Sequence, residues 1–320
     1  MSKNRVFSIA LFLAMSLFLS LSLQAAELKR IDLEEVLTIG SLDDDLIFQW
    51  TGVVVDSDSN IYLADAMDYC LKKFSPEGTL TKRAGGRGQG PGEFTAPRLL
   101  DCSEHYLYAT DQGILGLHVY DCDLNFERRI MLNIPVSDLK VLSDSRFAVA
   151  TLFMDTKPAI LIFDDRGELV QEIPYANRKM APMMDAVSFD IDAGGSLYLA
   201  YTFQDRVERW DSQGKKLWST QLLGAKRVKR KNISTYVLPT EVMFKDVELD
   251  SHGFLFVLGG HVSRNRSRDV YVLNRRGTLL TILTLPEASH CIHIDRNNFL
   301  YSRANEGVTL KKFRMHYVFD

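Results

Sequence analysis

The stretch Asp56-Ser-Asp-Ser-Asn-Ile-Tyr-Leu-Ala-Asp65 holds a turn rich in aspartate and serine, followed by a short apolar run. The apolar half of this phrase returns about every 48 residues along the chain. Its later copies occupy residues 106–110, 147–151, 197–201, 255–259 and 299–303. A period of this length that contains only strand and turn signals is typical of β-propeller blades. The sequence therefore predicts an all-β fold, a six-bladed β-propeller of four-stranded antiparallel blades.

A second repeated motif lies in the outer half of each unit. It is a short strand that ends in an aromatic residue or leucine, followed by a turn that begins at Ser75, Asp121, Asp164, Asp211 or Asn274. Such side chains bond to their own backbone, and a glycine in fourth place usually supplies the positive φ of the turn. The second blade lacks that glycine, so we expect its turn to differ. The innermost strands are expected to end at Asp56, Asp101, Asp192, Asp250 and Asp295, with Ser143-Asp144 in the third blade.

The sixth unit is one strand short. It has strand patterns at 289–294, 299–303 and 308–315, and the sequence ends at Asp320. A missing outer strand would leave an open sheet edge. Residues 31–39, which precede the first full unit, have the length and pattern of a strand. We therefore expect the N-terminal segment to pair with the last blade and to close the ring.

The N-terminus has the pattern of a secretory signal peptide over residues 1–26. Lys3 and Arg5 precede a long apolar stretch, and small residues follow at Ala25 and Ala26. This pattern predicts an export signal, a periplasmic or secreted protein, and no stable membrane insertion once the signal is removed. Residues 27–320 are then a single propeller domain, because propellers of this length fold as one unit.

The amino-acid composition limits the classes of partner that the protein is expected to bind. The chain is 46% hydrophobic and 25% charged, which is ordinary for a globular protein, and its formal net charge is −3. So small a charge does not favour nucleic acid or a membrane as partner of the whole molecule. The four cysteines, Cys70, Cys102, Cys122 and Cys291, allow three disulfide pairings among which the sequence does not choose, and buried free thiols are the simpler interpretation.

One linker carries a family resemblance. Gly85-Gly-Arg-Gly-Gln-Gly-Pro-Gly-Glu-Phe94 is followed by Ala96-Pro97. This segment resembles the phrase between blades of NHL-repeat propellers, in which a glycine-rich run, Pro-Gly-Glu-Phe and a proline precede an inner strand. The full phrase occurs once here, while the strand pattern extends over about residues 30–320. The resemblance implies an exported bacterial six-bladed propeller.

Propellers usually place their sites at one end of the central channel. That end is predicted to carry the starts of the inner strands and the loops that follow the second strands. The polar candidates for ligand binding at this mouth are Arg98, Asp138, Lys245, Asp246, His290 and Arg303.

Two basic segments are predicted to emerge on the same end of the ring. One precedes the fifth blade and the other is a loop within it. A polyanion could bind to their cations, which are Lys226, Arg227, Lys229, Arg230, Lys231, Arg264, Arg266 and Arg268. Two solvated loops are the alternative interpretation. The segments lack the interleaved aromatic residues that would favour nucleic acid specifically.

The leading functional hypothesis is an exported, non-enzymatic binding or scaffolding propeller that recognises a protein, peptide or glycan at the channel mouth, without a cofactor. The alternative is a metal-dependent lyase or hydrolase that uses zinc or calcium. His261 and His290 are its weak candidate ligands. Some NHL-like propellers are lyases with zinc held by histidines, and gluconolactonase-like propellers use a divalent metal held by acidic and amide side chains. Neither pattern matches residue by residue.

Overall fold

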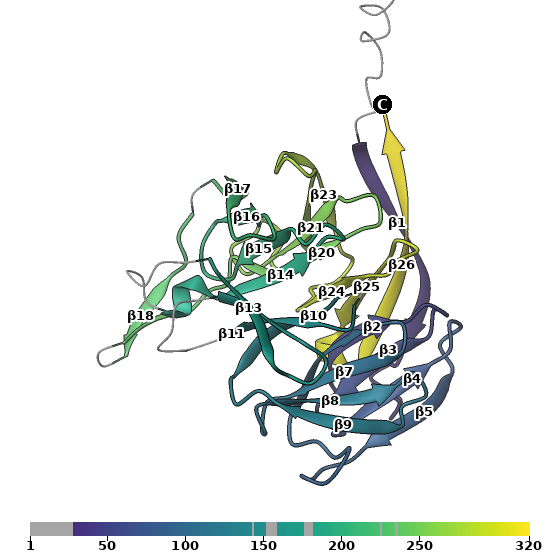
Figure 1. Cartoon of the computed structure of the whole chain (residues 1–320). Coiled ribbons are helices and arrows are strands. Elements are labelled where there is room, and N and C mark those ends of the chain that lie inside the picture. The colour runs from purple at the N-terminus through teal and green to yellow at the C-terminus, as the bar shows by residue number, and fades with distance from the viewer. Residues whose placement is uncertain (1–27, 143, 152–158, 176–181, 225, 234–235) are drawn as a thin grey trace, which may run out of the picture.

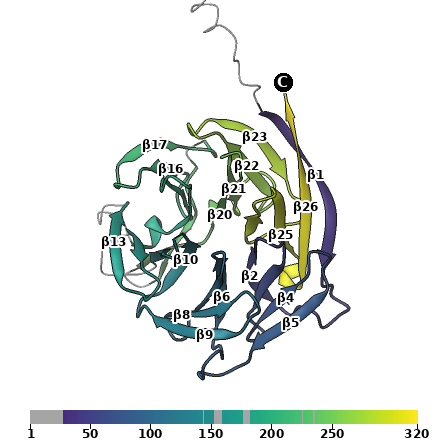
Figure 2. The same ribbon diagram turned by 45° about the vertical axis from the view of Figure 1, so that its right-hand side comes forward.

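The structure is a computed structural model that describes residues 28–142, 144–151, 159–175, 182–224, 226–233 and 236–320. The predicted signal peptide, residues 1–26, lies outside these. The described residues form six four-stranded antiparallel sheets and a separate two-stranded sheet. The six sheets surround a central channel as the blades of a propeller (Figure 1 and Figure 2). The predicted fold class is confirmed.

The first three blades run from the channel to the rim in chain order. Blade 1 consists of β2 (Trp50–Val55), β3 (Ile61–Asp65), β4 (Cys70–Phe74) and β5 (Leu80–Gly85). Blade 2 consists of β6 (Pro97–Cys102), β7 (Tyr106–Asp111), β8 (Gly116–Asp121) and β9 (Phe126–Met131). Blade 3 consists of β10 (Val136–Val141), β11 (Phe147–Thr151), β12 (Ala159–Phe163) and β13 (Leu169–Pro174).

The remaining blades include one departure from chain order, because the outermost strand of blade 6 is β1. Blade 4 consists of β14 (Val187–Ile191), β15 (Leu197–Tyr201), β16 (Val207–Trp210) and β17 (Lys216–Thr220). Blade 5 consists of β20 (Phe244–Leu249), β21 (Leu255–Gly259), β22 (Asp269–Leu273) and β23 (Leu279–Thr284). Blade 6 consists of β24 (Ile292–Ile294), β25 (Phe299–Ala304), β26 (Thr309–Phe319) and β1 (Leu28–Ile39). Outside the blades lie the hairpin of β18 (Arg230–Ile233) and β19 (Tyr236–Pro239) and two short 3-10 helices, η1 (Pro182–Asp185) and η2 (Asn305–Gly307).

The repeated phrase builds the second strand of every blade. These strands are buried on both faces because each blade packs against two others; β3, β15 and β21, for example, are buried throughout. The turn before the strand is held by its aspartate. Asp56 Oδ1 accepts the backbone N–H groups of Asp58 and Asn60, and Asp56 Oδ2 accepts the hydroxyl of Tyr62 at 2.8 Å. The same aspartate–tyrosine bond recurs in Asp192–Tyr198 and Asp295–Tyr301.

Blades 2 and 3 depart from the predicted strand ends. Asp101 lies inside β6, and the hydroxyl of Ser103 takes the place of the capping carboxylate, accepting the backbone N–H of Tyr106 at 3.1 Å. The turn of blade 3 begins at Leu142, whose N–H donates to the carbonyl of Arg146. A backbone turn of this kind closes without an aspartate at its first position. The innermost strands of these two blades end at Cys102 and Val141 instead.

The outer turn of blade 2 contradicts the expectation that it would differ. The N–H of Leu124 donates to the Asp121 carbonyl, as the fourth residue does in the glycine-containing turns, and Leu124 itself has φ of 54°. A leucine in this left-handed region is strained. Leu124 is nevertheless buried in the core between blades 1 and 2, and this burial offsets the strain.

The N-terminal strand closes the ring, as predicted. Strand β1 pairs antiparallel with β26, from Leu28 opposite Phe319 to Ile39 opposite Leu310. Ile39 is buried in a core cluster with Trp50 and Leu310, so β1 contributes to the core as well as to the sheet. β1 and β26 lie side by side at the rim of the ring in both ribbon views (Figure 1 and Figure 2).

Two further sequence features can be placed. All four cysteines are described, and each is a free thiol. Among the described residues, no helix has the length and apolar character needed to cross a membrane.

Candidate binding site at the channel mouth

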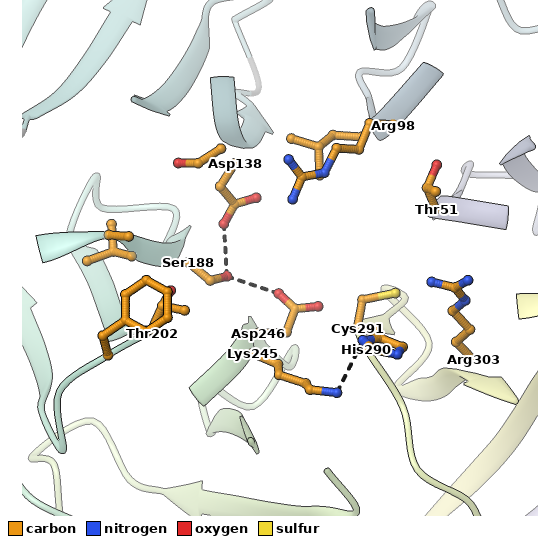
Figure 3. A pocket seen from close by; sticks show the side chains of 15 residues that line it. Thr51, Arg98, Asp138, Ser188, Thr202, Lys245, Asp246, His290, Cys291 and Arg303 are labelled. Atoms are coloured by element: carbon orange, nitrogen blue, oxygen red, sulfur yellow. Dashed lines mark hydrogen bonds between the residues drawn. The ribbon is translucent and has the colours of Figure 1, made fainter. Parts of the chain in front are cut away.

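A cavity of about 400 Å³ opens at one end of the channel (Figure 3). Every blade contributes to its wall, because the inner strands converge there. The lining includes all six residues predicted at the mouth, Arg98, Asp138, Lys245, Asp246, His290 and Arg303, together with Thr51, Ser188, Thr202 and Cys291. The structure thus brings the candidates together around one cavity.

Asp138 and Asp246 already have structural partners. The Asp138 carboxylate accepts the backbone N–H of Leu139 and, at 2.8 Å, that of Phe189 in the next blade. Asp246 likewise accepts the N–H of its own neighbour and, at 2.9 Å, that of Ile292 in blade 6. Each aspartate therefore ties the innermost strand of one blade to that of the next. Such bonds satisfy backbone groups that would otherwise face the channel unpaired.

The hydroxyl of Ser188 links these two aspartates, as the dashed lines in Figure 3 show. Its Oγ lies 2.9 Å from Asp138 Oδ2 and 3.0 Å from Asp246 Oδ1. A hydroxyl donates one proton, so one of the two carboxyls must donate to it. Burial raises the pKa of both groups, and Glu248 and Asp138 raise that of Asp246 further, well above its usual range. Of the two carboxyls, Asp246 therefore has the stronger tendency to hold a proton.

The cations at the mouth have no such pairing. Among the described residues, Arg98, Lys245 and Arg303 form no ion pair. Lys245 Nζ donates to the Ser289 carbonyl at 2.9 Å and contacts His290 Nδ1 at 3.2 Å, and Arg303 donates to the Glu306 carbonyl at 2.7 Å. Burial, with the charge of Arg303 nearby, lowers the pKa of Lys245 to about 8. The cavity is therefore a place where positive charge is in excess.

In the described part of the chain, the candidate histidines His261 and His290 lie among cations. Burial and the charges of Lys245 and Arg303 lower the pKa of His290 to about 4, and burial with Lys245 lowers that of His261. Within the described ranges there is no group of three or more His, Cys, Asp or Glu side chains placed to hold a metal ion. Cations that surround a histidine also repel a divalent metal. The geometry here suits an anion better.

Below the mouth, the channel contains a buried ion network. Lys140 Nζ lies 2.5 Å from Glu248 Oε1 and 3.7 Å from Asp190 Oδ1. Burial opposes the ionisation of Glu248, but Lys140 and His293 outweigh it and lower its pKa to about 2. Burial raises the pKa of Asp190 to about 7 despite the attraction of Lys140. Lys140, Asp190 and Glu248 lie two residues after Asp138, Ser188 and Asp246 on the same inner strands, and their charges compensate one another.

An apolar hollow lies beside the mouth and was not predicted from the sequence. It is lined by Leu42, Phe48, Gln49, Met67, Asn305, Glu306 and Val308. Leu42 is 74% exposed and Met67 is 64% exposed, which is unusual for side chains of this size. Two links relate the hollow to the mouth cavity: Gln49 lies two residues before Thr51, and Arg303 bonds to the Glu306 carbonyl. No local motif marks it, since its residues come from three separate loops.

The two basic segments meet near the mouth. Lys229 Nζ pairs with Glu241 at 3.1 Å, and Arg266 also acts on the charge of Glu241. Their cations other than Arg268 are exposed, and Arg268 Nε instead donates to the Leu285 carbonyl at 2.7 Å. Residues 230–233, expected to be linker, form β18 of a hairpin. Polyanion binding by these segments stays a prediction.

The chain matches no family model, and no curated protein matches it in sequence. Solved structures resemble it in fold. A member of the DUF4221 family from Bacteroides vulgatus superposes with a TM-score of 0.63 at 12% identity, covering 92% of this chain and 100% of that one. Virginiamycin B lyase from Staphylococcus aureus gives 0.55 at 11% identity, with 89% and 99% covered. A streptogramin B lyase gives 0.58 at 10% identity, with 90% and 98% covered. At these identities the likeness establishes a six-bladed β-propeller and nothing finer.

Proposed function

We propose that this chain is an exported, non-enzymatic binding propeller of the NHL-repeat-like type, which recognises a protein, peptide or glycan at the channel mouth. The observation that carries the proposal is the mouth cavity itself. It is walled by all six blades and holds three cations that no described residue pairs with. Pockets of this size with a few convergent polar groups are the usual sites of ligand binding. The N-terminal signal pattern supports export to the periplasm or the exterior.

The arrangement gives less support to the alternative, a metal-dependent lyase or hydrolase. The Ser188 hydroxyl hydrogen-bonds with two carboxyls and with no described histidine, so the serine–histidine pairing of many hydrolases is not seen among the described residues of the mouth. The histidine candidates stand among cations. Elemental analysis of the purified protein addresses this alternative directly: stoichiometric zinc or calcium that is lost in His261→Ala and His290→Ala would favour the enzyme over the binder.

A variant that fills the cavity tests the binding function. Thr202 lines the mouth, and its backbone rather than its side chain bonds to neighbouring loops. Thr202→Trp should therefore occupy the cavity and leave the fold intact. The matched control is Asp58→Trp, an exposed residue in the turn between β2 and β3 at the opposite end of the channel.

Binding would be measured by calorimetry against mixed N-acetylated tripeptides, acidic and neutral oligosaccharides. We expect at least one ligand class to bind to the wild type and to Asp58→Trp, and binding to be lost in Thr202→Trp. Equal binding by both variants would place the site elsewhere, and an absence of binding by every class would reject the proposal.

A further inference from the structure

The mouth cavity has an electrostatic requirement that the ligand must satisfy. Arg98, Lys245 and Arg303 belong to three different blades and line one cavity, as Figure 3 shows. Cations placed together in a partly desolvated site repel one another unless an anion joins them. Since no described carboxylate pairs with any of the three, the missing negative charge is left for a ligand to supply.

The acidic residues near the cavity do not meet this requirement. Asp138 and Asp246 bond to backbone N–H groups of the next blades and share the Ser188 hydroxyl, and neither forms an ion pair with Arg98, Lys245 or Arg303. Glu306 contacts Arg303 through its backbone carbonyl, and the charge of its carboxylate acts on Arg303 without forming an ion pair. Arginine and lysine in such a setting form charge-assisted hydrogen bonds with carboxylates, and these are stronger than neutral ones.

The apolar hollow further limits the class of ligand. Thr51 lines the cavity and Gln49 lines the hollow, and two residues of chain hold them at most about 7 Å apart. A peptide spans the same distance with two residues. The exposed Leu42, Phe48 and Met67 offer it a surface for an apolar side chain. An acidic polysaccharide repeats its charge along its length and presents no aliphatic side chain to the hollow.

We propose that the mouth recognises a peptide, with a peptide carboxylate bound among Arg98, Lys245 and Arg303 and a neighbouring apolar side chain in the hollow. This inference rests on the proposed binding function and names its ligand class. The exposed basic segments lie at the same end of the ring and would attract an anionic peptide over a longer range. The carboxylate is supplied either by a free C-terminus or by an acidic side chain.

The test uses calorimetry on the protein without residues 1–26. The probes are N-acetylated tripeptides ending in Leu, Met, Phe or Val with a free carboxyl, the same mixture as C-terminal amides, amides that carry one internal Glu, trigalacturonate, and maltotriose. The variants are Arg98→Gln and Lys245→Gln, with Arg276→Gln as the matched control because Arg276 is an exposed cation in the turn between β22 and β23, outside both the cavity and the basic segments. Met67→Ser tests the hollow.

We expect the free acids or the Glu-containing amides to bind, and the uncharged amides to bind at least about ten-fold more weakly. Arg98→Gln and Lys245→Gln should each weaken binding by about ten-fold or more, and Arg276→Gln should weaken it by less than about two-fold. Met67→Ser should weaken binding of the Leu and Met peptides. Free-acid binding alone identifies the C-terminus as the source of the carboxylate, and binding of the Glu-containing amides identifies the side chain.

Three results overturn the inference. Equal affinity for charged and uncharged peptides, or binding of trigalacturonate or maltotriose without peptides, would reject it while the mouth remains a binding site. Binding of no probe, with the thermal stability of the protein intact, would count against the proposed function as well.

Discussion

Lys140 and Glu248 form an ion pair that joins blade 3 to blade 5 across the central channel, with Nζ 2.5 Å from Oε1. The pair lies between innermost strands that are not neighbours in the ring, so it braces the channel from within. Because Asp190, Asp101 and Asp138 also act on Lys140, this one cation compensates several buried acids.

Replacing Lys140 by methionine should therefore destabilise the fold by about 3–5 kcal/mol, since it leaves buried negative charge without a partner. Urea unfolding monitored by circular dichroism measures the change. Lys29→Met is the control: Lys29 pairs with Asp320 on the surface, and its loss should cost less than about 1 kcal/mol. A Lys140 variant as stable as the control would show that the channel acids are neutral in the folded protein.

Asp190 should make stability depend on pH between about 4 and 7. Its pKa is about 7 in the folded protein and near the ordinary value for aspartate, about 3.9, in the unfolded chain. The folded state holds the extra proton in this window, so the contribution of Asp190 is fully present below pH 4 and is lost as the pH rises through 7. Glu248, with a pKa of about 2, acts below this window.

The measurement is the free energy of unfolding of wild type and Asp190→Asn from pH 4 to 8. We expect the wild type to lose stability relative to the variant as the pH rises, although the amide costs stability at every pH because one backbone N–H loses its acceptor. Asp45 is exposed, and the curve of unfolding free energy against pH for Asp45→Asn should be parallel to that of the wild type. Parallel curves for Asp190→Asn would contradict the proton assignment.

Ring closure by β1 predicts that a core change in this strand weakens the whole propeller. Ile39→Ala should cost about 2–5 kcal/mol, because Ile39 packs in a core cluster shared with blade 1. Circular dichroism and tryptophan fluorescence should report one common transition at a lower temperature. Val36→Ala, at an exposed position of the same strand, should have little effect. A second transition at the wild-type temperature would show that β1 is a separate appendage.

Because Leu124 has a left-handed conformation, we expect its glycine variant to be more stable than its alanine variant, the reverse of the usual order. Leu124→Ala loses the burial and keeps the strain, whereas Leu124→Gly loses the burial but relieves the strain. The glycine variant should therefore be more stable than the alanine variant by about 1 kcal/mol. The same two substitutions at Leu217, an exposed residue of β17, should give the usual order with alanine ahead. If the alanine variant were more stable than the glycine variant at Leu124 as well as at Leu217, backbone strain at Leu124 would be excluded.

The blades could be predicted because their signals are local. Alternation of side chains and capping aspartates act over fewer than about ten residues, so each copy of the phrase specifies its own strand and turn. The six mouth residues could be predicted for a related reason: once the inner strands are placed, their starts must lie at one end of the ring. The predicted closure followed from counting strands in the sixth unit.

The features that the sequence did not predict depend on contacts between residues that are distant along the chain. The partners of Asp138 and Asp246 lie one blade further along, at Phe189 and Ile292, and no motif connects them. Leu124 was mispredicted because burial outweighed a local preference for glycine. The hollow at Leu42 and Met67 exists only once three loops meet in space. These are tertiary effects, and a pattern read along the chain does not contain them.

The antiparallel pairing of Leu28 with Phe319 has a practical consequence for how the molecule can be attached. Strand β26 starts beside the mouth loop of η2 and runs to the other end of the ring, so both strand ends at this seam point away from the cavity. A tether fixed at either place would hold the propeller with its opening toward the surroundings. A short linker that joins Phe319 to Leu28 would give circular permutants in which β26 and β1 are covalently connected.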